Sequence, residues 1–385
     1  IFDILTHSMA FNPPIPMVDL KTQHGRIRSE LDKALLASAH AGRFINGPEV
    51  AVFAGELADY LQVEHVIPCA NGTDALQIAL MALGLNPGDE VITASFTYVA
   101  TAEVIALLQL KPVLVDVHPD HFTLDVDQVA AAITSRSKAI IPVHLYGQGA
   151  DMEPLMALAD KHGLFVVEDN AQALGADYLF SSGIQAKLGT VGHIGCTSFF
   201  PSKNLGCMGD GGALFTRDQA LADRIAMIAN HGQSVKYQHD VVGCNSRLDS
   251  IQAAVLQVKL KHLPAWTLAR QQVADRYDVG LTGLDQVVVP ARITQGSHVF
   301  HQYTIKVLDG QRNALKQCLA DAGIPSMIYY PIPLHKQKAY ASVDHGAGFP
   351  ISEQLSEVVL SLPMHPELDE STQHIITQTI QNFFS

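Results

Sequence analysis

The sequence has few charged residues, and positive charge is what it lacks most. Charged side chains make up 16% of the 385 residues, and 38 Asp and Glu outnumber 25 Lys and Arg, for a formal net charge of −13. A protein that binds nucleic acid needs a basic surface, so we expect no nucleic-acid partner. The deficit does not exclude a small anionic substrate, because a few local cations can make the potential of a cleft positive.

Cysteine is also scarce and irregularly spaced. The five cysteines form no Cys-x-x-Cys pair, so the sequence predicts neither a zinc site nor a disulfide framework. The eighteen histidines form no His-Glu-x-x-His motif, and we expect no bound metal. Reduced cysteines fit a cytoplasmic protein, and the cytoplasm is the location that we predict.

No apolar run is long enough to span a membrane. The longest candidate, residues 99–117, is interrupted by Glu103, Lys111 and Pro112, so we expect no membrane partner. The apolar content of the first residues is too short, and too interrupted by an acid, for a signal peptide. We expect residues 1–15 to be an N-terminal extension that is disordered or precedes the natural start.

What the sequence does contain is a regular alternation of helical and strand patterns from Glu30 onward. Such alternation predicts an α/β fold, with right-handed βαβ units around a mostly parallel seven-stranded sheet. The expected helices are 28–40, 48–61, 73–83, 98–108, 125–133, 152–162 and 218–230, and the expected strands are 65–68, 90–94, 112–117, 138–144, 164–168, 194–199 and 212–216.

After residue 247 the pattern changes. A helix over 248–263 and a second helical segment over 266–281 lead into a strand, a helix and a terminal helix that predict a small α+β domain. The length of the chain also favours two domains over one. We therefore predict a large domain over 16–263 and a small C-terminal domain over 264–385.

One lysine lies in a turn where it can become a nucleophile. Lys203 occupies a turn between the apolar runs 194–200 and 212–216 and is flanked by serine and glycine. A lysine that is desolvated there becomes nucleophilic at neutral pH and can form a Schiff base with an aldehyde. Taken alone, Lys203 is more readily interpreted as a solvated surface lysine, as most lysines are.

An acid and a helix start supply what such a lysine would need. Asp169 ends the apolar run 164–168, and ligands in open α/β sheets bind at such carboxyl ends. An aspartate there can pair with a pyridinium nitrogen, or equally with a structural arginine or a helix cap. Asn71-Gly72-Thr73 leads from a strand into a helix, where N–H groups favour a phosphate, although an ordinary N-cap has the same composition.

Together, the lysine, the acid and the phosphate-binding turn meet the needs of pyridoxal 5'-phosphate (PLP). In this combination the chain resembles the DegT/DnrJ/EryC1/StrS family of PLP-dependent nucleotide-sugar aminotransferases over nearly its whole length. The resemblance implies the aspartate-aminotransferase-like fold (fold type I), with active sites shared between the subunits of a homodimer. The motifs that carry it are Gly47-Pro-Glu-Val, Asn71-Gly-Thr-Asp-Ala-Leu, Phe96-Thr-Tyr-Val-Ala-Thr, Glu168-Asp-Asn-Ala-Gln, Ser198-Phe-Phe-Pro-Ser-Lys, Gly243-Cys-Asn-Ser-Arg-Leu-Asp and Tyr330-Pro-Ile-Pro-Leu-His.

The resemblance assigns cofactor roles to the matching positions. Lys203 is implied to be the Schiff-base lysine and proton carrier, and Asp169 to be the partner of the pyridine nitrogen. Either aromatic residue of Phe96-Thr-Tyr98 can stack on the ring; Phe96 is the first choice, with core packing as its alternative role. The other implied contacts are Gln172 to the phenolic oxygen, Gly72, Thr73 and Ser198 to the phosphate, and Asn245 to the phosphate in the neighbouring subunit.

The implied substrate is a nucleotide-linked keto-sugar, with glutamate as the amino donor. The closest resemblance is to aminotransferases that act on UDP-2-acetamido-2-deoxy-3-keto-glucuronic acid in O-antigen synthesis. The runner-up is a 4-aminotransferase for a UDP- or dTDP-4-keto-6-deoxy sugar. Arg247 is the candidate partner of the uronic acid carboxylate. Tyr329 departs from the histidine usual before Tyr330-Pro-Ile-Pro, so we expect Tyr329 and Tyr330, with His335, to contact the substrate.

Three other classes of protein fit the sequence less well. A nicotinamide-binding Rossmann enzyme needs Gly-x-Gly-x-x-Gly after a strand, and Gly147-Gln-Gly149 lacks the third glycine. The sugar dehydratases of the same family carry histidine in place of the Schiff-base lysine, so Lys203 argues against them. A non-catalytic sensor with a PLP fold is disfavoured by the complete set of lysine, acid and phosphate-binding turn.

Overall fold

The computed structural model describes residues 15–341, 343 and 348–385. Residues 1–14 of the predicted N-terminal extension lie outside the described residues. Ile15, the last residue of that prediction, is buried in the core that surrounds the small C-terminal sheet.

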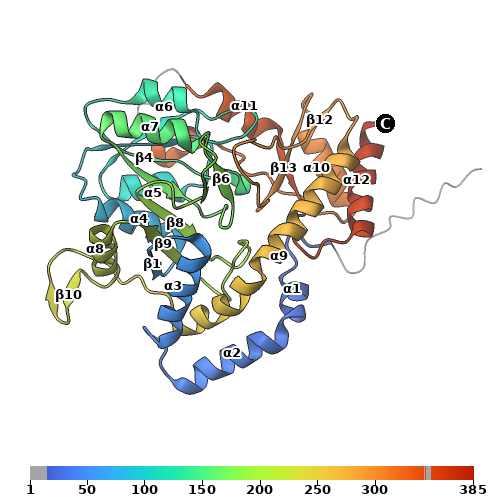
Figure 1. Ribbon diagram of the computed structural model, residues 1–385. Coiled ribbons are helices and arrows are strands. Elements are labelled where there is room, and N and C mark those ends of the chain that lie inside the picture. The colour runs from blue at the N-terminus through green and yellow to red at the C-terminus, as the bar shows by residue number, and fades with distance from the viewer. Residues whose placement is uncertain (1–14, 342, 344–347) are drawn as a thin grey trace, which may run out of the picture.

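A seven-stranded sheet forms the centre of the larger part, as the alternating pattern predicts (Figure 1). The strand order is β1-β9-β8-β5-β4-β2-β3, and every strand except β9 runs in the same direction. All seven strands lie within a few residues of the predicted positions. Their bounds are β1 His65–Cys69, β2 Glu90–Ala94, β3 Lys111–Val115, β4 Ser137–Ile141, β5 Phe165–Asp169, β8 Ile194–Ser198 and β9 Gly212–Thr216.

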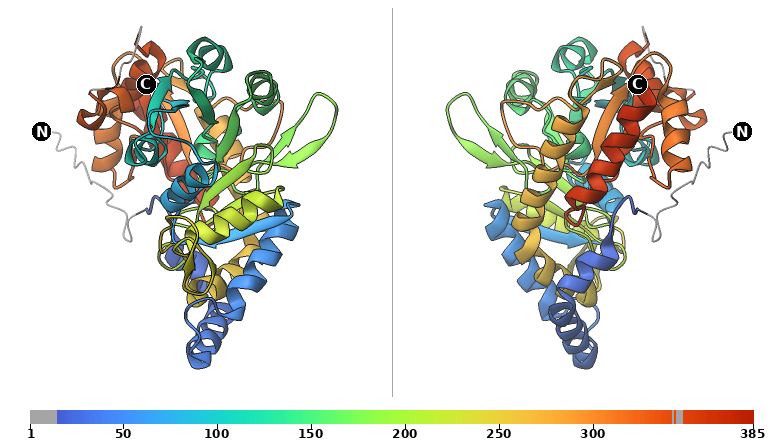
Figure 2. Two further views of the ribbon diagram at one scale, coloured as in Figure 1. Left: turned by 90° about the vertical axis from the view of Figure 1, so that its left-hand side faces the viewer. Right: turned by 90° about the vertical axis from the view of Figure 1, so that its right-hand side faces the viewer.

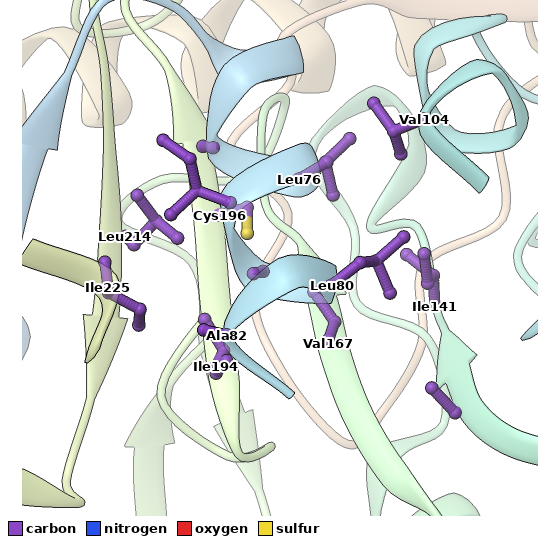
Figure 3. Close-up of a cluster of buried hydrophobic side chains, with 14 of the residues drawn as sticks. Leu76, Leu80, Ala82, Val104, Ile141, Val167, Ile194, Cys196, Leu214 and Ile225 are labelled. Carbon is purple, nitrogen blue, oxygen red and sulfur yellow. The ribbon is translucent and has the colours of Figure 1, made fainter. Parts of the chain in front are cut away.

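Helices cover both faces of this sheet, which explains why its strands are apolar without alternation. Leu76, Leu80 and Ala82 of α4 pack on strand residues such as Val167 and Ile194 (Figure 3). On the opposite face the sheet packs against α6 and α7 at one end and against α3 and α9 (Ser250–Leu281) at the other. The helices are α2 Arg28–Ala41, α3 Pro48–Leu61, α4 Gly72–Ala82, α5 Ala100–Leu107, α6 Val126–Ala132, α7 Met152–His162 and α8 Gln219–Ala229.

The two helical segments predicted around residue 264 are one helix. α9 runs continuously from Ser250 to Leu281 with Pro264 inside it. Proline removes one backbone hydrogen bond and disfavours a helix interior. Here packing opposes that cost, because α2 and α3 contact the helix on one side and α12 contacts it farther along (Figures 1 and 2). The proposed domain boundary at 263/264 therefore falls inside a continuous helix, and it stays a prediction.

A small sheet with its own core follows α9. Strand β13 pairs antiparallel with β12 on one side and with β14 on the other. Apolar residues of this sheet pack against α9, α10 and α12, which matches the predicted α+β character. The elements are β12 Val287–Val288, β13 Tyr303–Val307, α10 Arg312–Asp321, α11 Pro350–Val358, β14 Val359–Leu362 and α12 Glu370–Phe384.

Several short elements have no counterpart in the sequence prediction. Helix α11 and strand β14 follow each other without a connecting loop. Two small hairpins, β6–β7 and β10–β11, consist of only a few paired residues each. The other unpredicted elements are α1 Leu20–Arg26, β6 Asp177–Leu179, β7 Gln185–Lys187, β10 Gln233–Val235, β11 Gln238–His239, β12 and the short 3-10 helices η1 Leu145–Gly147, η2 Leu334–Lys336 and η3 Lys338–Tyr340. Within the described part of the chain, no helix has the length and apolarity that crossing a membrane requires.

Candidate active site

The predicted site residues meet at the carboxyl edge of the large sheet. In the strand register, Cys69 at the end of β1 lies opposite Gly212, and Gly212 also lies opposite Ser198 at the end of β8. Asp169 at the end of β5 lies opposite Cys196, two residues before Ser198. The ends of β1, β5 and β8 are therefore side by side, which is where open α/β sheets bind ligands.

The start of α4 faces Ser198 at very close range. Asn71 caps the helix, and its side-chain oxygen accepts a hydrogen bond from the Asp74 N–H at 2.8 Å. A Cβ at Gly72 would lie 2.6 Å from the Cβ of Ser198, and a Cβ at Gly212 would lie 2.5 Å from the Asn71 carbonyl. Only glycine permits these approaches, so the start of α4 is packed directly against the end of β8. The N–H groups at a helix start favour an anion, and we call Gly72 and Ser198 together the anion cradle.

Lys203 lies beside this cradle with its amine available. Burial lowers the pKa of the Lys203 amine to about 8, while the nearby Asp169 carboxylate acts in the opposite direction. Among the residues that the structure describes, none forms a hydrogen bond or an ion pair with this amine. The turn itself is fixed, because the Lys203 N–H donates to the Phe200 carbonyl at 2.8 Å and Lys259 donates to the Gly206 carbonyl at 2.6 Å. The lysine is thus half-buried, held at its backbone and unpaired at its amine.

Asp169 is buried and only partly satisfied by the protein. One carboxylate oxygen accepts from the Thr101 hydroxyl at 2.8 Å, and the other accepts from the Ala171 N–H at 3.2 Å. Among the described residues no arginine or lysine forms an ion pair with it. This arrangement leaves acceptor capacity on the carboxylate for a cationic ligand. It also removes the structural-arginine alternative for Asp169.

Gln172 and Tyr330, predicted to face cofactor and substrate respectively, are in direct contact. The Gln172 side-chain nitrogen donates to the Tyr330 hydroxyl at 3.2 Å. The Gln172 oxygen accepts from the backbone N–H of Tyr146 at 2.7 Å. Tyr146 was not predicted, and its hydroxyl donates to the Tyr329 carbonyl. Hydrogen bonds therefore join the residue predicted to contact the cofactor with those predicted to contact the substrate.

Comparison with known proteins identifies the family. The sequence matches the DegT/DnrJ/EryC1/StrS aminotransferase family over residues 26–381. The chain belongs to this family. It is 47% identical over 368 residues to the UDP-2-acetamido-2-deoxy-3-oxo-D-glucuronate aminotransferase of Pseudomonas aeruginosa, with 96% of this chain and 100% of that protein covered.

One further relative and one solved structure indicate the same family. The chain is 46% identical over 364 residues to the UDP-N-acetyl-3-dehydro-alpha-D-glucosamine 3-aminotransferase of Acidithiobacillus ferrooxidans, with 94% of this chain and 96% of that protein covered. A solved aminotransferase of the family from Brucella abortus is 44% identical, superposes with a TM-score of 0.92, and covers 96% of this chain and 100% of its own. These matches confirm the predicted fold type I and the predicted class of PLP-dependent sugar aminotransferases.

The residues at the sheet edge fit PLP. The cradle of Gly72 and Ser198 is closed to any added Cβ and suits a phosphate, the Lys203 amine is unpaired, and the Asp169 carboxylate has acceptor capacity left. In this aminotransferase, then, Gly72, Thr73 and Ser198 would hold the phosphate, Asp169 would hold the ring nitrogen and Lys203 would reach the aldehyde.

The two candidate stacking residues, Phe96 and Tyr98, differ in their burial. Phe96 is only 1% exposed and packs in a core cluster, edge-on to Tyr330 with ring centroids 6.0 Å apart. Tyr98 is 58% exposed and lies 6.3 Å from the same Tyr330 ring. The core-packing alternative for Phe96 therefore holds, and Tyr98 is the aromatic residue of the pair with a free face for the cofactor.

His335 has a different environment from the one expected of a substrate residue. Its Nδ1 lies 2.6 Å from the Ser95 hydroxyl, and its Nε2 lies 3.0 Å from a carboxylate oxygen of Glu353 on α11. Both ring nitrogens are thus engaged by protein groups. Ser95 is fully buried, so this serine, histidine and glutamate set is no nucleophilic triad. It ties the segment after Tyr330 to the end of β2.

The loop that carries Asn245 and Arg247 lies against the chain's own phosphate turn. Ser246, between them, accepts a hydrogen bond from the Ala70 N–H at 3.0 Å. Asn245 is exposed, and Arg247 is half-buried with no ion pair among the described residues. Both side chains are therefore available to a ligand or to a second subunit.

Three residues near the site were missed by sequence reasoning: Thr101, Tyr146 and His301. Thr101 lies in the quoted Phe96-Thr-Tyr-Val-Ala-Thr motif, where its place in the first turn of α5 was the available signal. His301 is buried, and burial together with the charges of Lys203 and Arg270 holds the pKa of its imidazole well below the usual value. A neutral imidazole beside Lys203 adds no positive charge that would compete with the cofactor. No sequence signal marks His301 or Tyr146.

Proposed function

We propose that this aminotransferase moves an amino group from glutamate to C3 of a UDP-linked 3-keto sugar. The observation that carries the proposal is the unpaired Lys203 amine facing Asp169 beside the Gly72 cradle, in a chain 47% and 46% identical to two aminotransferases of UDP-linked 3-oxo sugars. UDP-2-acetamido-2-deoxy-3-keto-glucuronic acid is the best candidate, and the product would serve as an O-antigen precursor. All five cysteines are free thiols, which supports the cytoplasm as the location.

When bound, PLP supplies an aldehyde that bonds to amines and a protonated ring that withdraws electrons from them. The protein supplies position and protons. Asp169 keeps the proton on the ring nitrogen, because a carboxylate beside that nitrogen favours its charged form. The N–H groups at the start of α4 and the Ser198 hydroxyl would hold the phosphate, and Gln172 would donate an N–H to the phenolic oxygen.

Lys203 carries the proton that transamination moves. Its amine must be neutral to bond to the aldehyde and to accept a proton from the substrate carbon. With the pKa lowered to about 8, a useful fraction of the amine is neutral near pH 7 and can return the proton to a neighbouring atom. An ordinary lysine, which is almost wholly protonated at that pH, would do neither.

The sugar side is formed by Arg247, Tyr329 and Tyr330. Arg247 has a guanidinium without an ion pair in the described chain, and it can bind the carboxylate of a uronic acid through two parallel hydrogen bonds. The Tyr330 hydroxyl accepts a hydrogen bond from Gln172, which would bring it close to a bound cofactor. The carboxylate partner distinguishes a glucuronic acid from an N-acetylglucosamine, since the latter carries no charge on the sugar.

The enzyme works as a homodimer in this proposal. Apolar side chains of Phe44, Ile45, Tyr237 and Val242 are between 48% and 86% exposed, which is typical of a surface covered by a partner. Phe44 and Ile45 adjoin the Arg247 loop, because Ile45 pairs with Asp249. The hairpin of β10 and β11 extends outward beyond α8 (Figure 1). Asn245 would then reach the phosphate bound by the neighbouring subunit.

The test loads the enzyme with an amino group from glutamate and then offers two keto-sugars in separate assays. The cofactor absorbance should return to that of the resting enzyme with UDP-2-acetamido-2-deoxy-3-keto-glucuronic acid, and mass spectrometry should find the amino sugar. Return of the absorbance only with a UDP- or dTDP-4-keto-6-deoxy sugar would replace the proposal by the 4-aminotransferase. A colourless protein that does not respond to glutamate would indicate the non-catalytic sensor.

A further inference from the structure

Tyr146 adopts a backbone conformation that a bulky residue normally avoids. It lies just after β4 with φ of 59°, in the left-handed region, and it is 3% exposed. A residue with a Cβ persists there only when its surroundings fix it. Gly147, which follows, has φ of 108°, and a Cβ on it would lie 2.9 Å from the backbone nitrogens of Phe300 and His301. The kink is therefore pressed against the segment beside Lys203.

Hydrogen bonds from its backbone and its hydroxyl hold Tyr146 in place, and the hydroxyl also bonds with Thr304 of β13. Its N–H donates to Gln172 at 2.7 Å, its carbonyl accepts from the Gln302 N–H at 3.2 Å, and its hydroxyl donates to the Tyr329 carbonyl. These partners come from three distant parts of the chain. They are the cofactor residue after β5, the segment before β13, and the sugar-side segment.

The bond to Gln172 fixes the direction of that side chain. A backbone N–H can only donate, so the amide of Gln172 must present its oxygen to Tyr146. Its NH2 group then points the other way, where one hydrogen bond goes to the Tyr330 hydroxyl at 3.2 Å. The second N–H remains to donate to an acceptor in the site, such as the phenolic oxygen of PLP.

We propose that Tyr146 is a positioning residue that holds the sugar-contacting segment Tyr329–Tyr330 in register with Gln172. This inference rests on the proposed function, because it assigns the sugar to that segment. Through its hydroxyl, Tyr146 sets the position of the Tyr329 backbone. Through its N–H, it sets the orientation of Gln172 toward both Tyr330 and the cofactor. One buried residue thereby fixes side chains assigned to the cofactor and to the sugar.

The test is Tyr146→Phe, which removes only the hydroxyl, and with it the bond to the Tyr329 carbonyl and the hydrogen bond with the Thr304 hydroxyl. The two half-reactions are measured separately by the absorbance of the bound cofactor. We expect kcat/KM of the sugar half-reaction to fall about tenfold, mainly through KM, as expected for loss of a buried hydrogen bond. The glutamate half-reaction should fall several-fold less, because the amino acid lacks the parts of the sugar nucleotide that the segment contacts.

A second readout does not depend on turnover. Calorimetric binding of the unreactive UDP-2-acetamido-2-deoxy-glucuronic acid should weaken by a similar factor in Tyr146→Phe. The matched control is Tyr277→Phe, which removes a buried hydroxyl that donates to the Pro363 carbonyl at 3.0 Å in the core of the small sheet. This control loses the same type of bond away from the site, so its half-reactions should stay in their original ratio.

A double variant checks that the residues act together. Tyr146→Phe with Tyr330→Phe should lose less than the product of the two separate losses, because both act on one segment. If the wild type accepts the sugar and Tyr146→Phe behaves as Tyr277→Phe does, the positioning role is wrong and the proposed function stands. If the wild type accepts no UDP-linked 3-keto sugar, the proposed function and this inference both fail.

Discussion

At the scale of single residues, the site depends on two opposed influences on Lys203. Burial favours its neutral amine, and the Asp169 carboxylate favours the charged form. The balance leaves the pKa of the amine at about 8, close enough to neutrality for a group that must gain and lose a proton. Asp169 needs its charge for the ring nitrogen, so this compromise follows from the function of both residues.

The pH dependence of cofactor capture tests this balance. In cofactor-free enzyme, the rate at which PLP bonds to Lys203 should rise with pH and level off above a midpoint near 8, because only the neutral amine reacts. Stopped-flow absorbance measures this rate. A rate that keeps rising up to about pH 10 would show an ordinary lysine.

Asp169→Asn is the companion variant in that experiment. Removing the carboxylate removes the influence that raises the pKa of Lys203, so the midpoint should move below 8. The amide cannot keep a proton on the ring nitrogen, so transamination should slow by orders of magnitude while PLP still binds. An unchanged midpoint would show that the two side chains do not interact.

Sequence reasoning found the residues whose role follows from their own chemistry. Lys203, Asp169, Gly72 and Ser198 come together as the motifs predict. It did not find Tyr146, whose role depends on partners more than twenty-five residues away in the chain. Phe96 and Tyr98 show the same limit, since both are aromatic and only burial separates them.

At the scale of elements, the start of α4 determines how the phosphate is held. Gly72 allows the helix to approach the end of β8 more closely than any side chain would permit. The alternation of strands and helices made these two elements predictable, because each has a clear apolar period and turn signals at its ends. It did not reveal that α9 is continuous, because packing by α2, α3 and α12 opposes the local effect of Pro264.

Gly72→Ala should damage both folding and cofactor binding. The added Cβ would meet Ser198 at 2.6 Å, so the free energy of unfolding should fall by about 1–3 kcal/mol, as for overpacking elsewhere. The affinity for PLP should fall as well, because the helix start must move. Chemical denaturation and fluorescence titration measure the two effects.

Two further variants isolate the cause. Gly55→Ala, at an open position within α3, should raise the free energy of unfolding by about 0.5–1 kcal/mol without changing PLP affinity. Adding Ser198→Gly to Gly72→Ala removes the 2.6 Å contact but leaves the Ser198 Cα position at 3.2 Å, so it should restore part of the stability, although not the hydroxyl contact to phosphate. A Gly72→Ala variant as stable as the wild type would show that the start of α4 can accommodate a Cβ beside Ser198.

At the scale of the whole molecule, the proposed dimer decides which subunit Asn245 serves. Ser246 holds the Asn245 loop against the chain's own Ala70, so a contact within one subunit is a real alternative. Mixing Lys203→Ala and Asn245→Ala subunits separates the two. If Asn245 serves the partner, hybrid dimers carry one intact site and the mixture recovers about a quarter of wild-type activity. No recovery, despite demonstrated subunit exchange, would place Asn245 in its own subunit's site.

The most direct test of the central claim follows the nitrogen atom. Purified enzyme with PLP is given glutamate with an isotopically labelled amino group and UDP-2-acetamido-2-deoxy-3-keto-glucuronic acid. We predict that NMR finds the label bonded to C3 of the sugar in the wild type, and that Lys203→Arg, which keeps the charge but cannot bond to the aldehyde, transfers none. Label at another carbon, no label at all in the wild type, or equal transfer by Lys203→Arg would contradict the claim.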